Sequence, residues 1–474
     1  MKKHGLLKIL GLILLLVVIA SYVLAGRSGG KDFIGIFDVA FNGFKSLYYF
    51  FYIALFVLSI GGFYGVLNKA PRYKKLLDNI TKKIKPLGKK FIFVLIIIFA
   101  VVASLTGMTL PLLVFIPFVI SIILLLGYDK LVAITTTVVS TMIGYIGGVF
   151  ATFYNPNTYG MTTYESFVGT ESAFSNVFPK LLLLFAGITL LIYFVNNYIK
   201  NVENKKVKYE LEEDSEVQIN EVTNEYRSIR TWPLIVVFSL MFVILVLGLV
   251  PWNTLFGITI FNEFHTWLME LSIEEFAIIP SIFSGDLVAF GEWYSKGDSM
   301  TYMIICLIMT LSTVVVALVG KVKLNDAIDA YKEGMKKMLP TAALLVIALT
   351  VLITSYTHGF FENIVSTYGK FNYGISSLLT FLGCILNIDM YYVAVGVFTP
   401  ILNVITDESV YSSVAILLQG IYGIFSVVGP TSIILIFALS YLNVPYTTWL
   451  KYIWRFILAL IVLLALVTLL VVLL

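Results

Sequence analysis

Two short polar segments, each with a proline, interrupt long apolar runs of this chain. Their residues are the ones best suited to bind a small polar molecule or an ion. They read Asn155-Pro156-Asn157-Thr158 and Gly429-Pro430-Thr431-Ser432. Proline removes a backbone hydrogen bond from a helix, and the carbonyl oxygen left free can coordinate a cation. The N–H groups at the start of the next half-helix can hold an anionic group. We therefore predict that both segments break membrane helices and bind a substrate and an ion. The alternative is a packing kink or a helix end at the membrane surface.

Two apolar blocks, 91–126 and 371–405, have small or polar residues near their middles. Each block is too long for one membrane helix, so we predict two hairpins that enter the membrane and return. The tip of the first holds Thr106, Gly107, Met108 and Thr109, and the tip of the second holds Asn387, Ile388 and Asp389. Polar tips within the membrane would face the two helix breaks across a shared site.

Asp389 is the most informative single residue, because a carboxylate within apolar sequence costs about 2.5–3.5 kcal/mol on insertion scales. Such a residue usually faces a cavity. Three functional interpretations are open: a sodium ligand, a proton carrier, or the counter-charge for a cationic substrate. The structural alternative is a helix cap at the membrane surface. The first tip has no acid at the corresponding place.

The composition places these residues in a polytopic membrane protein. Of 474 residues, 59% are hydrophobic and 13% are charged, whereas a soluble domain has about 25% charged residues. This excludes a water-soluble enzyme and a disordered chain. The net charge of +4 argues against a nucleic-acid partner. With no nucleotide-binding loop, catalytic triad or metal-ligand cluster, we expect no cofactor and no enzymatic activity. Energy would come from a gradient of sodium, protons or substrate.

Runs of about 20 apolar residues are long enough to span a bilayer. They lie at 9–25, 47–67, 131–153, 179–199, 232–251, 300–319, 340–357, 409–428 and 450–474. By the positive-inside rule, the basic loop 68–90 is expected on the cytosolic side of the cytoplasmic membrane. This places the N-terminus on the cytosolic side as well. We take the first run as an uncleaved helix, with a signal peptide as the alternative. The charged stretch 200–231 is then a cytosolic linker, and the acidic segment 253–299 lies outside.

Short patterns recur in the same order in both halves, which indicates an internal repeat. Asp38 to Lys45 resembles Asp329 to Lys336, and Asp129 and Asp407 each precede a span. We interpret the last two as interfacial helix caps. The unpaired span 232–251 would invert the second copy, as in many secondary transporters. The fold class is therefore all-α, with two inverted repeats, about nine spans and two re-entrant hairpins. The predicted units are a first repeat (1–199; hairpin 91–126, broken helix 131–158), a linker (200–231), a span with an outer segment (232–299), and a second repeat (300–474; hairpin 371–405, broken helix 409–443).

These patterns resemble the YfcC-type family, which is grouped with four-carbon dicarboxylate carriers and arginine–ornithine antiporters in the ion-transporter superfamily. The resemblance runs through Gly61-Gly62-Phe63, Thr106-Gly107-Met108, Pro117, Gly127-Tyr128-Asp129, Asn155-Pro156, Gly334-Met335, Gly429-Pro430-Thr431-Ser432 and Val444-Pro445-Tyr446. Where many relatives carry acids after the first tip, this chain has Thr109-Leu110. The resemblance implies a scaffold region, a mobile transport region that moves like an elevator, and a homodimer.

We expect a secondary active transporter in the cytoplasmic membrane that moves an amino acid, including a basic one, or a dicarboxylate, by ion coupling or exchange. The partners would be a small-molecule substrate and the lipid bilayer. The expected binding residues are Asn155, Asn157, Thr158, Thr431, Ser432, Thr106, Thr109, Asn387 and Asp389, with the helix breaks at Pro156, Gly429 and Pro430 and with sodium at Asp389 as one option. The alternative function is a receptor or assembly protein that keeps a transporter fold without transport.

Overall fold

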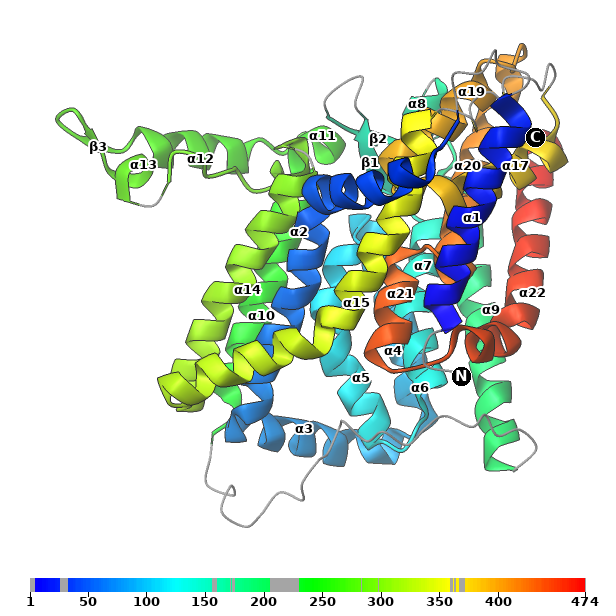
Figure 1. Ribbon diagram of the computed structural model, residues 1–474. Coiled ribbons are helices and arrows are strands. Elements are labelled where there is room, and N and C mark those ends of the chain that lie inside the picture. Colours follow the sequence, from blue (N-terminus) through cyan, green and yellow to red (C-terminus); the bar gives the residue numbers. More distant parts are fainter. Residues whose placement is uncertain are drawn as a thin grey trace.

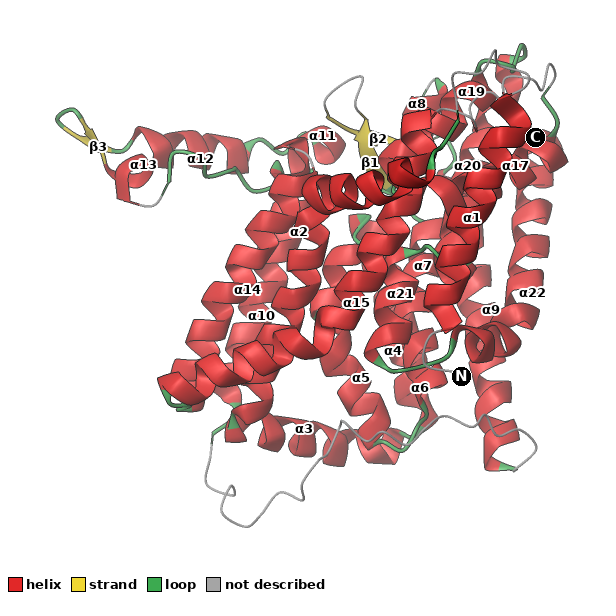
Figure 2. Cartoon of the chain, viewed as in Figure 1, coloured by secondary structure: helices red, strands yellow, loops and turns green. Residues whose placement is uncertain are grey.

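The structure is a computed structural model, and it consists almost entirely of helices (Figure 2). It describes residues 5–25, 33–155, 160–170, 172, 175–204, 230–282, 284–296, 298–358, 361, 364–365 and 371–473. The predicted linker lies mostly outside these residues. The first half contains α1 (Gly5–Ala25), α2 (Ile36–Lys69), α3 (Pro71–Ile84), η1 (Lys85–Leu87), α4 (Lys89–Thr106), η2 (Leu110–Val114), α5 (Ile116–Leu125), α6 (Lys130–Ile134), the π-helix η3 (Thr135–Val139), α7 (Ser140–Ile146), β1 (Thr152–Asn155), β2 (Gly160–Thr163), α8 (Tyr164–Val168) and α9 (Val177–Glu203).

The remaining elements form a middle segment and a second half. The middle segment contains α10 (Trp232–Leu249), α11 (Trp252–Phe256), α12 (Ile260–Glu270), β3 (Ser272–Ile273), β4 (Phe276–Ala277), α13 (Ile278–Ile282) and η5 (Trp293–Lys296). The second half contains α14 (Asp298–Gly320), α15 (Leu324–His358), α17 (Tyr373–Asn387), α18 (Met390–Val393), the π-helix η6 (Ala394–Phe398), α19 (Thr399–Leu402), η7 (Glu408–Val410), α20 (Tyr411–Val428), α21 (Ile433–Tyr441) and α22 (Tyr446–Leu473).

The all-helical, polytopic membrane architecture is confirmed. Within the described residues, 9 helices are long and apolar enough to cross a membrane. One of them is not among the predicted spans: Lys89–Thr106, the first arm of the first hairpin, has the length of a span. Conversely, the predicted span 131–153 is wrong in its extent, because its apolar helix covers only Lys130–Ile146. Two glycines, Gly147 and Gly148, follow this helix and favour its termination.

Helix–turn–helix segments stand at both places where hairpins are predicted. The first consists of α4, a turn at Gly107, and η2 with α5; the second consists of α17, a turn at Ile388, and α18 to α19. In Figure 1, α3, which precedes the first segment, lies at the lower edge of the molecule, whereas α19, which ends the second, lies at the upper edge. The start of the first segment and the end of the second therefore lie at opposite edges of the molecule. The inverted symmetry of two whole repeats stays a prediction.

Helices α2 and α15 cross closely on small residues, and α14 packs beside them. A Cβ atom on Gly61 would lie 2.5 Å from the carbonyl oxygen of Gly334, and one on Gly65 would collide with the carbonyl of Ala330. Gly61 and Gly65 form a GxxxG pattern, which lets membrane helices approach backbone to backbone. The Gly61-Gly62 and Gly334-Met335 patterns therefore serve helix packing rather than substrate binding.

Replacing Gly334 by alanine should lower the free energy of unfolding by about 1–3 kcal/mol, because an overpacked contact must shift backbone atoms. The new Cβ would collide with the carbonyl oxygen of Gly61. Thermal unfolding in detergent measures the effect. Gly43→Ala in α2 is the matched control, since its Cβ would find its nearest neighbour 3.8 Å away, at Thr350 Oγ1. Equal unfolding temperatures for the two variants would contradict the close crossing.

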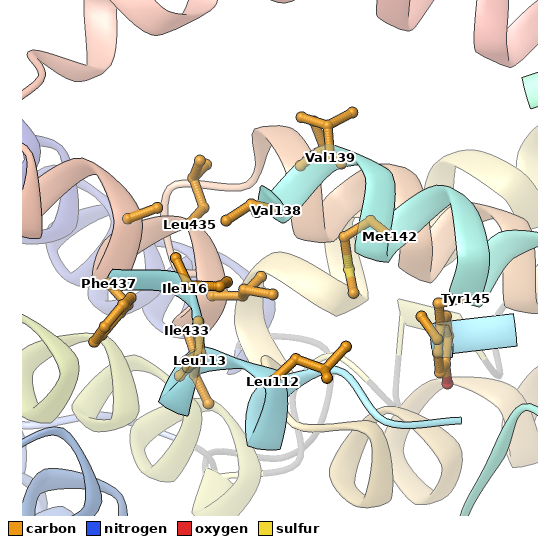
Figure 3. Close-up of a cluster of buried hydrophobic side chains, with 14 of the residues drawn as sticks. Leu112, Leu113, Ile116, Val138, Val139, Met142, Tyr145, Ile433, Leu435 and Phe437 are labelled. Atoms are coloured by element: carbon orange, nitrogen blue, oxygen red, sulfur yellow. The ribbon is translucent and has the colours of Figure 1, made fainter. Parts of the chain in front are cut away.

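Apolar side chains from separate parts of the chain meet in one buried cluster (Figure 3). Leu112 and Ile116 come from the return arm of the first hairpin, Val138 and Met142 from η3 and α7, and Ile433 from α21. All of these side chains are buried. The first hairpin, the α6–α7 helix and the second helix break are therefore packed into one unit.

Candidate functional site

The tip of the second hairpin presents one carboxylate. Helix α17 ends at Asn387, Ile388 has a φ of 53°, and Asp389 is the N-cap of α18. The Asp389 carboxylate accepts a hydrogen bond from the Tyr391 N–H at 3.0 Å, so it caps α18. The Asn387 amide donates to the carbonyl of Gly383 at 3.1 Å and is buried. Asp389 is partly exposed. Of the two residues, it is therefore the one available to a ligand.

The second predicted break lies between α20 and α21, where Gly429 to Ser432 are not helical. Thr431 Oγ1 donates to the carbonyl of Ile385 in α17 at 2.9 Å, which joins the break to the second hairpin. Ser432 Oγ donates to the carbonyl of Ser426 at 2.8 Å and caps α21. Both hydroxyls are buried and bonded to backbone. In this conformation they hold the break together.

The sequence suggests that the carbonyl oxygens next to this break are free to coordinate a cation. The structure shows that they accept hydrogen bonds instead. Tyr446 Oη donates to the carbonyl of Val428 at 2.5 Å, and Trp449 Nε1 donates to the carbonyl of Val427 at 3.0 Å. Both aromatic residues begin α22. They satisfy the oxygens because an unpaired carbonyl buried away from water is costly. The Val444-Pro445-Tyr446 pattern therefore contains the donor, Tyr446, whose hydroxyl bonds to a carbonyl oxygen next to the break.

The prediction that Asn155 interrupts a membrane helix is wrong. Asn155 does not interrupt a helix but ends strand β1, where it pairs with Gly160 of β2. Pro156, Asn157 and Thr158 lie outside the described residues. The physical reason is local: Asn and Pro are turn formers, and β-branched and aromatic residues such as Thr152 and Phe153 favour strands. The membrane helix that precedes the β1–β2 strand pair ends earlier, at Ile146.

The tip of the first hairpin lies against the segment that follows α7. A Cβ on Gly107, whose φ is 66°, would lie 3.0 Å from the carbonyl oxygen of Phe150. Thr106 Oγ1 donates to the carbonyl of Val102 at 2.6 Å and accepts from the Met108 N–H at 3.2 Å. Thr109 is half-buried. Gly107 at the tip is therefore close to Phe150 and Thr152, and the Thr106 hydroxyl is bonded within its own segment.

Gln419 joins the two halves of the molecule at the end of α7. Its amide nitrogen lies within 2.6 Å of the Tyr145 carbonyl, 3.2 Å of the Ile146 carbonyl and 3.1 Å of the Gly148 carbonyl. Gln419 is fully buried in α20. These are hydrogen bonds between two helices that are far apart in the chain, and they bond the end of α7 to α20. We call this contact the α7 junction.

Three buried or half-buried tyrosines extend the α7 junction to the tip of the second hairpin. Tyr145 Oη lies 2.7 Å from Tyr164 Oη, and Tyr164 Oη donates to the sulfur of Met390 at 2.9 Å. Tyr422 Oη donates to the carbonyl of Ile388 at 3.3 Å. Sequence reasoning missed all three. The position of Tyr145 and Tyr422 within apolar runs is the signal that could have identified two of them, whereas Tyr164 lies between predicted spans and gave no such signal.

A buried ion pair, not anticipated from the sequence, lies beside this cluster. Lys180 Nζ of α9 is 2.8 Å from Glu165 Oε2 of α8, and the two side chains are 2% and 0% exposed. Asn176 donates to Glu165 Oε1 at 3.0 Å and to the carbonyl of Ser412 at 2.8 Å. The group ties α8 and α9 to α20. The sequence signal was a single lysine at the start of an apolar run.

Asp129 and Asp407 are helix caps, as predicted. Asp129 Oδ1 accepts from the Val132 N–H at 2.8 Å and Oδ2 accepts from Tyr198 Oη at 2.5 Å. Burial raises the pKa of Asp129, and these two hydrogen bonds oppose the rise. Asp407 is exposed, and its hydrogen bonds with Ser409 lower the pKa of its carboxyl group. Neither residue lies at a hairpin tip.

The polar groups therefore converge where the end of α7 meets both hairpin tips and α20. The first tip reaches it through Phe150, and the second through Tyr164 and Met390. Across the described ranges, no three His, Cys, Asp or Glu side chains group to hold a metal ion. The groups at this place are hydroxyl, amide and carboxylate groups, which are the kinds of group that orient small polar molecules by hydrogen bonds.

Three comparisons with known proteins place this geometry in context. Residues 50–473 match the family described as DcuC: C4-dicarboxylate anaerobic carrier. None of the curated proteins matches the chain. Among solved structures, the YdaH transporter of Alcanivorax borkumensis is similar with a TM-score of 0.40 and 13% sequence identity, over 97% of each chain.

Proposed function

This chain belongs to the C4-dicarboxylate anaerobic carrier family, and we propose that it is a secondary active transporter of an amino acid, driven by an ion gradient or by exchange. The observation that supports an amino acid is Asp389, a half-buried acidic residue at the tip of the second hairpin. A carboxylate there can balance the ammonium or guanidinium group of a substrate, or a coupling sodium ion or proton. Lys180, which lies near the cluster, is paired with Glu165.

A four-carbon dicarboxylate is the second candidate substrate, and the family supports it. Hydroxyl groups and half-helix N-termini can bind a carboxylate without a lysine. Uptake assays with purified protein in liposomes separate the two substrates. Labelled arginine and labelled succinate are supplied in turn, with an imposed sodium gradient, an imposed pH gradient, or unlabelled substrate inside. Accumulation of neither compound nor of related metabolites under any gradient would favour a non-transporting receptor.

Asp389→Asn should lower uptake at least about tenfold, which corresponds to about 1.4 kcal/mol of lost interaction. Asparagine keeps an oxygen that can accept from the Tyr391 N–H, so the cap of α18 persists while the charge is removed. Asp407→Asn is the matched control, since it makes the same chemical change at an exposed cap. Undiminished uptake by the Asp389 variant would remove this carboxylate from the mechanism.

We further propose that the protein lies in the cytoplasmic membrane as a homodimer, with its N-terminus inside. The support for this orientation is α3, whose Lys82 and Lys83 are exposed along the lower edge of the molecule (Figure 1). Basic residues favour the cytosolic side. A cysteine introduced by Lys83→Cys should be shielded from a membrane-impermeant thiol reagent in intact cells and should react after the cells are opened. Labelling in intact cells would reverse the orientation.

A further inference from the structure

The amide group of Gln419 is matched unevenly to its surroundings. Its nitrogen lies 2.6, 3.2 and 3.1 Å from the carbonyl oxygens of Tyr145, Ile146 and Gly148. A primary amide has two N–H bonds, so it cannot satisfy three acceptors equally. The other end of the amide has the opposite mismatch, because Oε1 is buried and no described residue donates a hydrogen bond to it. A buried polar atom without a partner is rare in a folded protein and calls for a physical explanation.

The three carbonyl oxygens lie at a helix end that carries partial negative charge. The helix formed by α6, η3 and α7 runs from Lys130 to Ile146, and its dipole places about half a negative elementary charge at this end. The Tyr145 carbonyl also accepts from the Gly148 N–H at 3.0 Å, and the Gly148 carbonyl accepts from the Ala151 N–H at 3.4 Å. A carbonyl oxygen has two lone pairs, so these bonds leave one for a further partner. The helix end therefore favours a cation.

Close packing of three helices holds this end of α7 in place. A Cβ on Gly144 would collide with a carbonyl oxygen of α4, and one on Gly147 would lie 2.5 Å from the Leu184 nitrogen in α9. A Cβ on Gly423 of α20 would collide with the Ile146 side chain. The backbone of α7 therefore has little room to move. Oxygens that are already fixed in position bind an ion without the cost of ordering them.

The second helix break shows what is special about an amide as the donor. There, the carbonyls of Val427 and Val428 each accept from a donor of their own, Trp449 and Tyr446. At the end of α7, one amide serves all three carbonyls. A half-turn of this amide exchanges Nε2 for Oε1 in nearly the same space. Oε1 would then lie beside the carbonyl oxygens, which is stable only if a cation lies between them.

We propose that the α7 junction is a cation site, in which Gln419 Oε1 and the three carbonyl oxygens coordinate one dehydrated sodium or potassium ion. All four ligands are neutral oxygens, which suit a monovalent ion, as in the carbonyl rings of potassium channels. Calcium sites use carboxylates instead. The ion joins α20 to α7 and so bonds the two halves of the molecule. This inference goes beyond the proposed transport activity, because the ion binds here whatever the substrate is.

Thermal unfolding of the full-length protein in detergent tests the site, with sodium, potassium or choline chloride at equal ionic strength. A ligand that binds only the folded state raises the unfolding temperature as its concentration increases. We expect sodium or potassium to raise it relative to choline, and the ion that acts at the lower concentration is the occupant. The rise should be lost in Gln419→Leu, which has no side-chain oxygen. Equal unfolding temperatures of the wild type in all three salts would overturn the proposal.

Gln419→Glu separates a cation site from a junction made only of hydrogen bonds. The carboxylate cannot donate to the carbonyl oxygens, so the unfolding temperature in choline should fall below that of the wild type. The added charge should lower the half-maximal ion concentration at least about tenfold, since the affinity of oxygen sites rises with ligand charge. A variant that is destabilised in choline and not rescued by either ion would show hydrogen bonds alone and would overturn the proposal.

Two further variants locate the ion within the molecule. Ser426→Ala should keep the wild-type response to the ions, because its hydroxyl donates to the Tyr422 carbonyl within α20. Its loss in this variant would mean that any change in α20 abolishes the response, which would count against the site. A response that survives Gln419→Leu but is lost in Asp389→Asn would place the ion at the tip of the second hairpin and would overturn the proposal.

Discussion

Lys180→Met should lower the free energy of unfolding by about 3–5 kcal/mol, which is the usual cost of leaving one member of a buried ion pair alone. Lys180 Nζ lies 2.8 Å from Glu165 Oε2, and neither side chain is more than 2% exposed. Methionine fills a similar volume but supplies no charge or donor, so the carboxylate of Glu165 loses its counter-ion. Chemical unfolding of the purified protein in detergent, together with the yield of folded protein, measures the loss.

Two controls separate this effect from a general sensitivity to lysine replacement. The double variant Lys180→Met with Glu165→Gln should recover much of the lost stability, because it removes the charge left alone in the core. Lys332→Met should change little, since Lys332 and Asp329 are 71% and 74% exposed and their atoms are 3.6 Å apart. If the double variant were less stable than Lys180→Met, charge compensation would not be the role of Glu165.

Gln419→Leu should reduce uptake at least about tenfold and lower the free energy of unfolding by about 1–3 kcal/mol, the usual cost of an unsatisfied buried polar group. The amide of Gln419 donates to carbonyl oxygens of Tyr145, Ile146 and Gly148 across the α7 junction. Leucine is close to glutamine in size but has no hydrogen-bond donor. The end of α7 would then be free to shift relative to α20, and it borders both hairpin tips.

Uptake into liposomes and thermal unfolding of the same preparations test this prediction. Ser426→Ala is the control within α20, because its hydroxyl donates only to the carbonyl of Tyr422 in its own helix, at 2.9 Å. It should retain most of the uptake. Wild-type uptake and stability in the Gln419 variant would mean that the two halves do not depend on this contact.

The sequence alone predicts the elements whose causes are local. An apolar run of a certain length makes a membrane helix wherever it occurs, and 9 described helices have that character. A polar tip within a long apolar block produces a turn, as at Gly107 and Ile388. Gly429 and Pro430 occur together where the helix is interrupted between α20 and α21. Capping by Asp129 and Asp407 also involves only the next few residues.

Only the tertiary structure decided how each polar group is satisfied. Asn155 looks like part of a helix break, yet it is the last residue of strand β1, because α7 ends at Ile146, nine residues earlier. From the local sequence, the carbonyls of Val427 and Val428 would be free to bind an ion. In the folded protein, Trp449 and Tyr446 of α22 donate hydrogen bonds to them. Gln419 and Lys180 reach partners that no local pattern identifies. The physical reason is that a buried polar group must find a partner, and residues far apart in the chain become neighbours only when the helices pack.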